Sequence, residues 1–361
     1  MARLEDVCEI LDSKRVPITA KDRVAGPYPY YGANGVQDYV ADYIFDDELV
    51  LLAEDGGHFG STDKPIAYRV KGKCWVNNHA HVLKAKDCID IDYLCYSLMF
   101  RDVSDIVNGA TRQKLTQADM RKIEIPLLPI AEQKSVVAKI SKVFELIALR
   151  KEQLAKLDRL VKSRFIELFG DPKNTKNHLV KIGEIGALTS GGTPSRAKPE
   201  YFEGDIRWYS AGELNSLYLP DSVEHISEIA LQQSSAKLFN KGTLMIGMYD
   251  TAAFKMGILT EDSSSNQACA NLNPKQGYNI VWLYYLFDIM KPIFLQERQG
   301  VRQKNLSLSK IKEFEVPFAP FELQNQFATF VEQTDKSKLK VQKSLEKLEL
   351  LKKALMQKYF G

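Results

Sequence analysis

The most regular hydrophobic pattern along the chain is a spacing of three and four residues that occurs in two long segments. In the first segment the apolar positions are Val136, Ile140, Val143, Ile147, Leu154, Leu157 and Val161. In the second segment they are Phe327, Val331, Val341, Leu345, Leu348 and Leu355. This spacing puts one apolar stripe on a helix, and a stripe of this kind favours a partner helix. We therefore expect two long helices, within 129–170 and 321–361.

Prolines and a glycine mark the ends of these two helices. Pro126 and Pro129 precede the first helix, and Pro317 and Pro320 precede the second, where each breaks the strand before it. Gly170 suits the C-terminal end of the first helix. A helix of about 38 residues would be roughly 57 Å long.

Both helices belong to a longer internal repeat. Residues 108–170 align with 299–361 without a gap, and thirteen of the 63 pairs are identical, whereas random pairing would give about four. Two copies related by a pseudo-two-fold axis would pair their helices antiparallel. The alternative is that each amphipathic helix covers only its own domain.

The pairing model also predicts where the helices pack less tightly. The stripe is apolar except near Arg150, Thr334 and Lys338. We expect looser packing at these polar positions than in the leucine zone, which consists of Leu154, Leu157, Leu345 and Leu348.

The stretches before the helices read as globular domains. Residues 1–128 and 171–320 mix short apolar runs with turn signals such as Asn34-Gly35 and Gly191-Gly192. Both stretches contain an apolar, helix-like piece, which begins at Tyr93 in one and at Trp282 in the other, and outside it they diverge in sequence. The expected fold class is α+β, with two mixed globular domains joined by two long antiparallel helices.

Charge becomes informative only when it is divided along the chain. The formal net charge is +3, but residues 130–170 carry +4 and residues 321–361 carry +3, so the remainder carries −4. Any contact of the globular stretches with nucleic acid therefore depends on local basic loops.

The compartment follows from what the chain lacks. The five cysteines, Cys8, Cys74, Cys88, Cys95 and Cys269, form no Cys-x-x-Cys pair, which indicates reduced thiols. The first residues show no apolar signal segment, and the longest strongly apolar run, 281–287, is too short to span a bilayer. We expect a cytoplasmic protein that does not contact a membrane.

Catalytic motifs are also missing from the sequence. Adenine methyltransferases usually carry an Asn/Asp-Pro-Pro-aromatic motif, but here Asn273-Pro274 is followed by Lys275. No phosphate-binding loop of the G-x-x-x-x-G-K-[ST] type occurs. The nuclease-like fragments Pro220-Asp221 and Glu132-Gln133 lie in different segments. We therefore expect no catalytic residue and no cofactor of this chain's own.

A histidine pair is the one candidate for a metal site. His79 and His81 would share a face if their segment were a strand. No third ligand stands out nearby in the sequence. Side chains bonded within the fold are therefore the favoured interpretation, and we expect no metal.

Short motifs in a fixed order carry a family resemblance. In the first half they are Lys14-Arg15-Val16-Pro17-Ile18, Tyr28-Pro29-Tyr30-Tyr31-Gly32-Ala33-Asn34-Gly35, Glu54-Asp55-Gly56 and Asn77-Asn78-His79-Ala80-His81-Val82-Leu83. In the second half they are Ser190-Gly191-Gly192-Thr193-Pro194-Ser195, Glu200-Tyr201-Phe202-Glu203-Gly204-Asp205-Ile206-Arg207-Trp208 and Asn266-Gln267-Ala268. Together with the 191-residue repeat, nearly the whole chain resembles the specificity subunits of type I restriction–modification systems.

The resemblance implies a division of labour. Residues 1–128 and 171–320 would be target-recognition domains that each read one half of a split site in double-stranded DNA. Residues 129–170 and 321–361 would be spacer helices that set the gap and dock two modification subunits, which restriction subunits then join. S-adenosylmethionine, ATP and magnesium would bind those partners. Because the Gly-Gly-Thr-Pro stretch has no copy in the first half, the resemblance implies an asymmetric target.

Candidate DNA contacts lie in three places. The glycine-containing loops 109–114 and 300–305 carry Arg112, Lys114, Arg302 and Lys304, which could reach phosphate or guanine, or lie in solvated turns. The segment with Tyr30, Tyr31 and Asn34 is either a set of base-edge contacts or a packed aromatic turn. The side chains beside Gly191-Gly192, Arg196 and Lys198, are phosphate candidates.

Two other functions are compatible with the same residues. The helices could support self-assembly in a two-domain scaffold or adaptor that does not touch DNA. The chain could also be a specificity subunit of a related system in which nuclease and methyltransferase are one polypeptide.

Overall fold

The computed structural model describes residues 1–109, 113–175, 178–298 and 305–361. The chain forms two compact units. The first unit contains residues 1–152 and 342–361, and the second contains residues 153–341. Each unit therefore contains one globular region and a part of each long helix.

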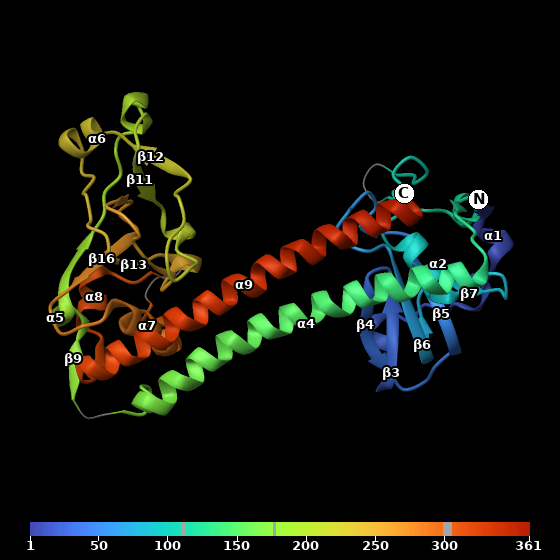
Figure 1. Cartoon of the computed structure of the whole chain (residues 1–361), viewed down its shortest axis with the longest axis horizontal. Coiled ribbons are helices and arrows are strands. Elements are labelled where there is room, and N and C mark those ends of the chain that lie inside the picture. Colours follow the sequence, from blue (N-terminus) through green and yellow to red (C-terminus); the bar gives the residue numbers. More distant parts are fainter. Residues whose placement is uncertain (110–112, 176–177, 299–304) are drawn as a thin grey trace. The chain divides into compact units, whose positions relative to one another are not determined.

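The first unit is built on a six-stranded sheet in the order β2-β7-β5-β6-β3-β4 (Figure 1). All neighbours are antiparallel except β3 and β6, which are parallel. The strands are β2 (Cys8–Ile10), β3 (Ala25–Gly32), β4 (Gly35–Val40), β5 (Phe45–Ala53), β6 (Ala67–Val76) and β7 (Ala80–Ala85). The run Leu49–Ala53 is buried on both faces, as its unbroken apolar sequence requires in a central strand.

Helices close one face of this sheet. The helix α2 (Ile91–Met99) begins at Asp90, whose side chain accepts hydrogen bonds from two backbone amides of the first turn, and it packs on β5 and β6. The shorter elements are β1 (Ala2–Arg3), α1 (Leu4–Val7), η1 (Asp12–Lys14), η2 (Ala20–Asp22), α3 (Gln117–Arg121) and β8 (Glu124–Ile125). Strand β1 pairs with β8, and this pairing returns the chain to its start before the long helix α4 (Ile130–Phe169).

The second unit divides its strands between two main sheets, β10-β16-β13-β14 and β12-β11-β15, and a small pair, β17-β9. The strands are β9 (Leu179–Lys181), β10 (Gly186–Ser190), β11 (Ile206–Tyr209), β12 (Glu224–Ile226), β13 (Leu244–Gly247), β14 (Met256–Ile258), β15 (Ser264–Ser265), β16 (Cys269–Pro274) and β17 (Glu315–Pro317). The helices are α5 (Ile182–Ile185), α6 (Glu228–Gln233), α7 (Ile280–Phe294), α8 (Leu308–Glu313) and the 3₁₀ turns η3 (Pro199–Phe202), η4 (Ala211–Glu213), η5 (Asp250–Ala252) and η6 (Leu295–Glu297).

The two globular regions share one topology although their sequences diverge. The Leu4 amide donates to the Ile123 carbonyl at 2.9 Å, as Ile182 does to Phe314 at 2.8 Å. Equivalent backbone bonds and strand orders show which strands correspond. In order, β2, β7, β5, β3 and β4 of the first unit correspond to β10, β16, β13, β11 and β12 of the second. The long strand β6 corresponds to two short strands, β14 and β15, so one sheet in the first unit becomes two in the second. The sequence showed this shared frame only around Tyr93 and Trp282 and at the start of the 191-residue repeat.

The two expected long helices are confirmed. They are α4 (Ile130–Phe169) and α9 (Phe321–Phe360), each 40 residues long. At the end of α4, Gly170 has a φ of 75°, and its amide donates to the Ile166 carbonyl at 2.8 Å. This left-handed conformation suits glycine, as the sequence predicted.

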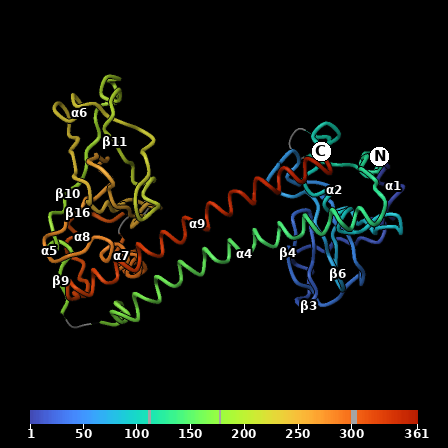
Figure 2. The backbone as a smooth tube through the Cα atoms, in the orientation of Figure 1, coloured from blue at the N-terminus to red at the C-terminus, as the bar shows by residue number. Residues whose placement is uncertain are grey.

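Within each unit the helix segments run antiparallel, as Figure 2 shows. In the first unit, Arg150 Nε donates to Ser344 Oγ at 3.3 Å, and Lys151 Nζ lies 3.1 Å from Glu349 Oε1. In the second unit, Lys338 Nζ lies 2.7 Å from Asp158 Oδ1. The helices also cover the globular cores, because Val136 and Ile140 lie in the core of the first unit.

Most of the predicted stripe is buried. The buried members are Val136, Ile140, Val143, Ile147, Val161, Phe327, Val331, Val341 and Leu345. The half-buried members are Leu154, Leu157, Leu348 and Leu355.

The expectation that the helices pack less tightly at the polar positions than in the leucine zone is wrong. Thr334 is buried, while Leu154 and Leu157 are only half-buried. The antiparallel register brings the polar positions to the level of the leucines, since Asp158, the partner of Lys338, directly follows Leu157.

Two buried glutamines fix the start of the long helices in the same way. Gln133 and Gln324 have no exposed surface. Gln133 Oε1 accepts the Asp90 amide at 2.7 Å, and Gln324 Oε1 accepts the Asn279 amide at 2.8 Å. Asp90 and Asn279 cap α2 and α7, so each glutamine ties the first turn of a long helix to the cap of a short one.

All five cysteines are free, and only Cys88 is exposed. Among the described residues, no helix is both long and apolar enough to cross a membrane.

Candidate nucleic-acid interface

Turns at one end of the first unit's sheet converge on residues 55–56. Asn34, in the turn between β3 and β4, donates from Nδ2 to the Gly56 carbonyl at 3.0 Å. His79 Nδ1 lies 2.8 Å from Asp55 Oδ1. The Gly56 amide donates to the Gln113 carbonyl at 3.4 Å, which brings in the end of the predicted basic loop. Asn34 and Gln113 are exposed, so this end of the sheet presents polar side chains to solvent.

The predicted aromatic contacts lie nearer the interior than Asn34. Tyr30 is 1% exposed, and its hydroxyl accepts the Ile18 amide at 3.0 Å. Tyr31 is half-buried against Tyr68, with 5.8 Å between ring centroids. The packed alternative therefore describes Tyr30, whose ring would have to leave the core to reach a base. Base contact by Tyr31 or Asn34 stays a prediction.

Of the four predicted loop cations, one lies in the described part of the chain. Lys114 Nζ is 2.9 Å from Glu54 Oε1, and half of its side chain is exposed. Its charge is thus partly matched within the fold, and its phosphate contact stays a prediction. Arg112, Arg302 and Lys304 lie outside the described residues.

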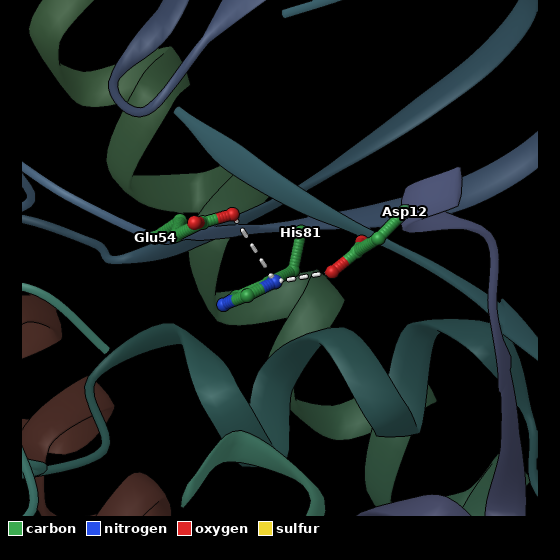
Figure 3. A group of neighbouring side chains, drawn as sticks. All are labelled: Asp12, Glu54 and His81. Carbon is green, nitrogen blue, oxygen red and sulfur yellow. Dashed lines mark hydrogen bonds and ion pairs between the residues drawn. The ribbon is translucent and has the colours of Figure 1, made fainter. Parts of the chain in front are cut away.

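Glu54 belongs to a buried ion network that the sequence did not predict (Figure 3). Its other oxygen, Oε2, lies 2.6 Å from Arg15 Nη1. His81 has no exposed surface; its Nδ1 lies 2.6 Å from Asp12 Oδ2, and its Nε2 lies 2.9 Å from the Leu115 carbonyl oxygen. We call Asp12, Arg15, Glu54 and His81 the anchor network.

Both carboxyl groups of the anchor network are stabilised as anions. Burial works to raise the pKa of Asp12, but its hydrogen bond and its electrostatic interaction with His81 lower it below 3.8. Burial also opposes ionisation of Glu54, and hydrogen bonds from Arg15 and Lys114 lower its pKa below 4.5. The network therefore keeps two ionised carboxylates at buried positions, where apolar surroundings alone would disfavour them.

The same three acceptors, Asp12, Glu54 and His81, are close enough to hold a metal ion, with ligand atoms within 4.8 Å of one another. Each ring nitrogen of His81 already faces an oxygen, and Arg15 and Lys114 lie on the oxygens of Glu54. These partners fit an ion network rather than a metal centre. Sequence reasoning did not identify a third possible ligand, because Asp12 and Glu54 are far from His81 along the chain. His79 lies in a turn and not on a strand, so the two histidines do not share a strand face, and both bind carboxylates within the fold.

In the second unit, the predicted phosphate contacts are engaged within the fold. Arg196 binds the Glu224 carboxylate with both terminal guanidinium nitrogens, Nη1 to Oε1, and Nη2 to Oε2 at 2.8 Å, and stacks 4.3 Å from the Phe202 ring centroid. Lys198 Nζ donates to the Tyr201 hydroxyl at 2.9 Å. Both side chains lie at the surface, so their contacts with phosphate stay predictions.

The Gly-Gly-Thr-Pro motif has a packing role. A Cβ at Gly192 would lie 1.9 Å from the Ser235 carbonyl oxygen, and one at Gly191 would lie 2.2 Å from that of Ser265. The Trp208 indole also donates to the Gly192 carbonyl at 3.0 Å. Close backbone approach therefore explains these glycines.

An arginine that sequence reasoning missed occupies the place of Arg196 in the first unit. Arg23 lies 4.2 Å from the Tyr30 ring centroid, and its Nη1 lies 3.2 Å from Asp38 Oδ2. Tyr30 pairs with Asp38 across β3 and β4, as Trp208 pairs with Glu224 across β11 and β12. The sequence carries no signal for this match, because the spacing between arginine, aromatic residue and carboxylate differs between the halves.

Comparison with known proteins agrees with this duplicated architecture. The model of the type I restriction modification DNA specificity domain matches the chain twice, over residues 1–159 and 174–350. The chain belongs to this family. The resemblance noted in the sequence is thereby confirmed.

Individual relatives match shorter segments. A Haemophilus influenzae protein provisionally named as a type I restriction enzyme specificity subunit is 37% identical over 134 residues, which are 37% of this chain and 34% of that protein. The type I restriction enzyme MjaIX specificity subunit of Methanocaldococcus jannaschii is 31% identical over 178 residues, 47% of this chain and 41% of that protein. The chain thus matches less than half the length of either relative.

The fold has a close counterpart among solved structures. The S subunit of a type-I restriction-modification system from M. genitalium matches with a TM-score of 0.62 at 16% identity, covering 100% of this chain and 95% of that one. At this identity the likeness concerns the fold alone.

Proposed function

We propose that this chain is the DNA specificity subunit of a type I restriction–modification complex, and that each unit reads one half of a split, asymmetric site. The observation that carries the proposal is a shared backbone frame with unlike side chains. Equivalent backbone bonds hold Glu54 in one unit and Met248 in the other, since the Glu54 amide donates to His79 and the Met248 amide donates to Ala268, both at 2.9 Å. Reading two different half-sites requires such a difference in side chains at equivalent places.

The long helices supply the docking surface for two modification subunits in this proposal. Leu160 and Leu351 are related by the repeat, and they are 48% and 45% exposed. One lies in each unit, which suits two copies of the same partner. Restriction subunits then join the modification subunits.

The chemistry belongs to the partners in this proposal. S-adenosylmethionine binds the modification subunits, and ATP and magnesium bind the restriction subunits. This chain contributes the choice of sequence and no catalytic group.

The proposal is tested by reconstitution and mapping of methylated adenines in genomic DNA. The chain with its modification subunits is expected to methylate a two-part site whose halves differ. The purified chain alone, with S-adenosylmethionine and DNA, is expected to transfer no methyl group. Assembly without sequence-selective DNA binding would favour a scaffold instead, and methyl transfer by the chain alone would contradict the division of labour.

The helices also set the gap between half-sites in this proposal. Inserting seven residues after Arg150 and after Val341 lengthens each helix by about 10 Å, which is about three base pairs of B-DNA. The methylated half-sites are expected to keep their sequences and move apart. An unaltered gap in an active complex would assign the spacing to another element.

A further inference from the structure

We propose that the anchor network is a positioning device that determines which bases the first unit reads. This inference rests on the proposed function. The network lies beneath the surface formed by Asn34, Asp55, Gly56, His79 and Gln113, which we call the reading surface. Its members are too buried to touch DNA, so they would act through the residues above them.

Glu54 is the hub of the network. Its carboxylate lies 2.6 Å from Arg15 Nη1 and 2.9 Å from Lys114 Nζ. Its backbone carbonyl accepts the Leu115 amide at 2.7 Å. One residue therefore holds the segment 114–115 by both its side chain and its main chain.

The other members contact this segment or the residues around it. His81 Nε2 contacts the Leu115 carbonyl, while Asp12 accepts Gln117 Nε2 at 3.0 Å. Arg15 Nη1 also donates to the Ala80 carbonyl at 2.8 Å, at the start of β7. The orientation of the loop end is thus set by charged contacts from η1, β7 and the end of β5.

Hydrogen bonds carry this orientation to the reading surface. Lys114 is bridged to Asp55 by backbone pairing, and Gln113 accepts the Gly56 amide. Asn34 and His79 bind the same pair, 55–56, from two other turns. A shift of Lys114 would therefore move polar side chains that come from different turns, and base contacts depend on such placement.

The second unit indicates that the charges are not needed to dock the loop. There Leu306 donates its amide to the Met248 carbonyl at 2.8 Å, which is the equivalent of the Leu115 bond to Glu54. Met248 is buried in an apolar core. Since Met248 and Leu306 dock that loop by a backbone bond and by apolar packing, the charged groups of the first unit have another role, which we assign to orientation.

The test compares Glu54→Gln with Arg69→Gln in complexes reconstituted with modification subunits. Glu54→Gln keeps the side chain's size and removes its charge beneath the reading surface. Arg69→Gln is the matched control, because Arg69 also bridges two carboxylates in the first unit, Glu48 and Asp92. The readout is the methylated sequence across a randomised site, together with the melting temperature of each variant.

For Glu54→Gln we expect selectivity at one or more base pairs of the first half-site to fall at least about tenfold, since one good base contact contributes a factor of roughly 5 to 150. The second half-site is the internal control and should not change. Arg69→Gln should leave both halves unchanged even where it lowers the melting temperature. An unchanged first half-site in Glu54→Gln, or an equal change in Arg69→Gln, would overturn the inference.

Two further variants separate positioning from loss of folding. If Glu54→Gln does not fold, Lys114→Met removes the same ion pair from a half-exposed position, and Lys114→Arg should restore the first half-site. A uniform loss of affinity for all sequences in Lys114→Met, rescued by arginine, would make Lys114 a phosphate contact and overturn the positioning role. A wild-type complex that methylates no two-part site would instead contradict the proposed function itself.

Discussion

The two units use equivalent backbone bonds to dock the loop before α3 in the first unit and the loop before α8 in the second, but they fill the space beside those bonds differently. The first unit places Glu54 there, with Arg15 and Lys114 on its oxygens. The second places Met248 there, in one apolar core with Phe254 and Phe294. The two units therefore share these main-chain bonds and differ in the side chains beside them, as the proposed reading of two different half-sites requires.

At the edge of the sheet the units agree instead. An arginine stacks over an aromatic ring and binds a carboxylate on the neighbouring strand, with Arg23 over Tyr30 in one unit and Arg196 over Trp208 in the other. The arginine contact at the sheet edge is therefore a shared structural support, and the side chains beside the loop are the variable part of each unit.

The largest effect is expected from exchanging a whole domain. Replacing residues 1–128 with the matching domain of a relative should change one half of the methylated site completely and leave the other half unchanged, because each unit has its own core. Methylation mapping in the reconstituted complex measures this. A simultaneous change in both halves would show that the units do not read independently.

The next largest effect is expected from a charge at Met248, the buried residue of the second unit that corresponds to Glu54. Met248→Glu puts a carboxylate at a position that is 3% exposed and lies in an apolar core. We expect it to lower the free energy of unfolding by about 3–5 kcal/mol, the usual cost of an unpaired buried charge. Denaturant unfolding measures the change.

Two control variants complete this comparison. Met248→Leu conserves volume and should cost less than about 1.5 kcal/mol. Glu54→Met in the first unit should cost less than Met248→Glu, about 1–3 kcal/mol, because Arg15 keeps its bond to the Ala80 carbonyl. Equal losses of stability in Glu54→Met and Met248→Glu would contradict the expected difference between a charged position in the first unit and an apolar one in the second.

What could be predicted from the sequence follows from the range of each interaction. The long helices were predictable, because their apolar stripe repeats every three or four residues and Gly170 marks an end. The buried glutamines were visible only as repeated letters, Gln133 and Gln324, since their partners Asp90 and Asn279 are over forty residues away. Periodicity reports which face of an element is buried, but not which distant group it meets there.

The candidate site was less predictable for the same reason. Lys114 was identified by its charge, but its partner Glu54 lies sixty residues earlier, directly after β5. For Tyr30 the sequence left a base contact and a packed aromatic turn open, and in the structure β3 turns the ring inward. Arg23 gave no signal, because loops of different length separate it from Tyr30 and separate Arg196 from Trp208.

A smaller difference between the units is expected in acid. The folded state lowers the pKa of Asp12 and Glu54 below their ordinary values of 3.8 and 4.5. Their contribution to stability is therefore present above pH 4.5 and is lost as the pH falls through the lowered values. Hydrogen exchange of β5 should accelerate in that range before exchange of β13, which has Met248 beside it.

The variant Glu54→Gln is the control for the acid experiment. It should remove part of the pH dependence of β5 and leave that of β13 unchanged. Surface carboxylates of the second unit such as Glu224 are screened by solvent and contribute less. Earlier acid loss in β13 than in β5 would contradict this ordering.

The smallest effect tests the feature that the two units share. Arg23→Lys and Arg196→Lys keep the positive charge but remove the planar guanidinium that stacks on the ring and binds the carboxylate. The Arg23 side chain is 17% exposed and that of Arg196 is 57% exposed. We expect a loss of about 1 kcal/mol for Arg23→Lys, and less for Arg196→Lys, since cation–π and ion-pair contacts weaken with exposure to solvent. Unfolding of each variant, followed by hydrogen exchange of β3 and β11, gives the two values, and a larger loss at Arg196 would show that the matched arginines do not serve the same structural role.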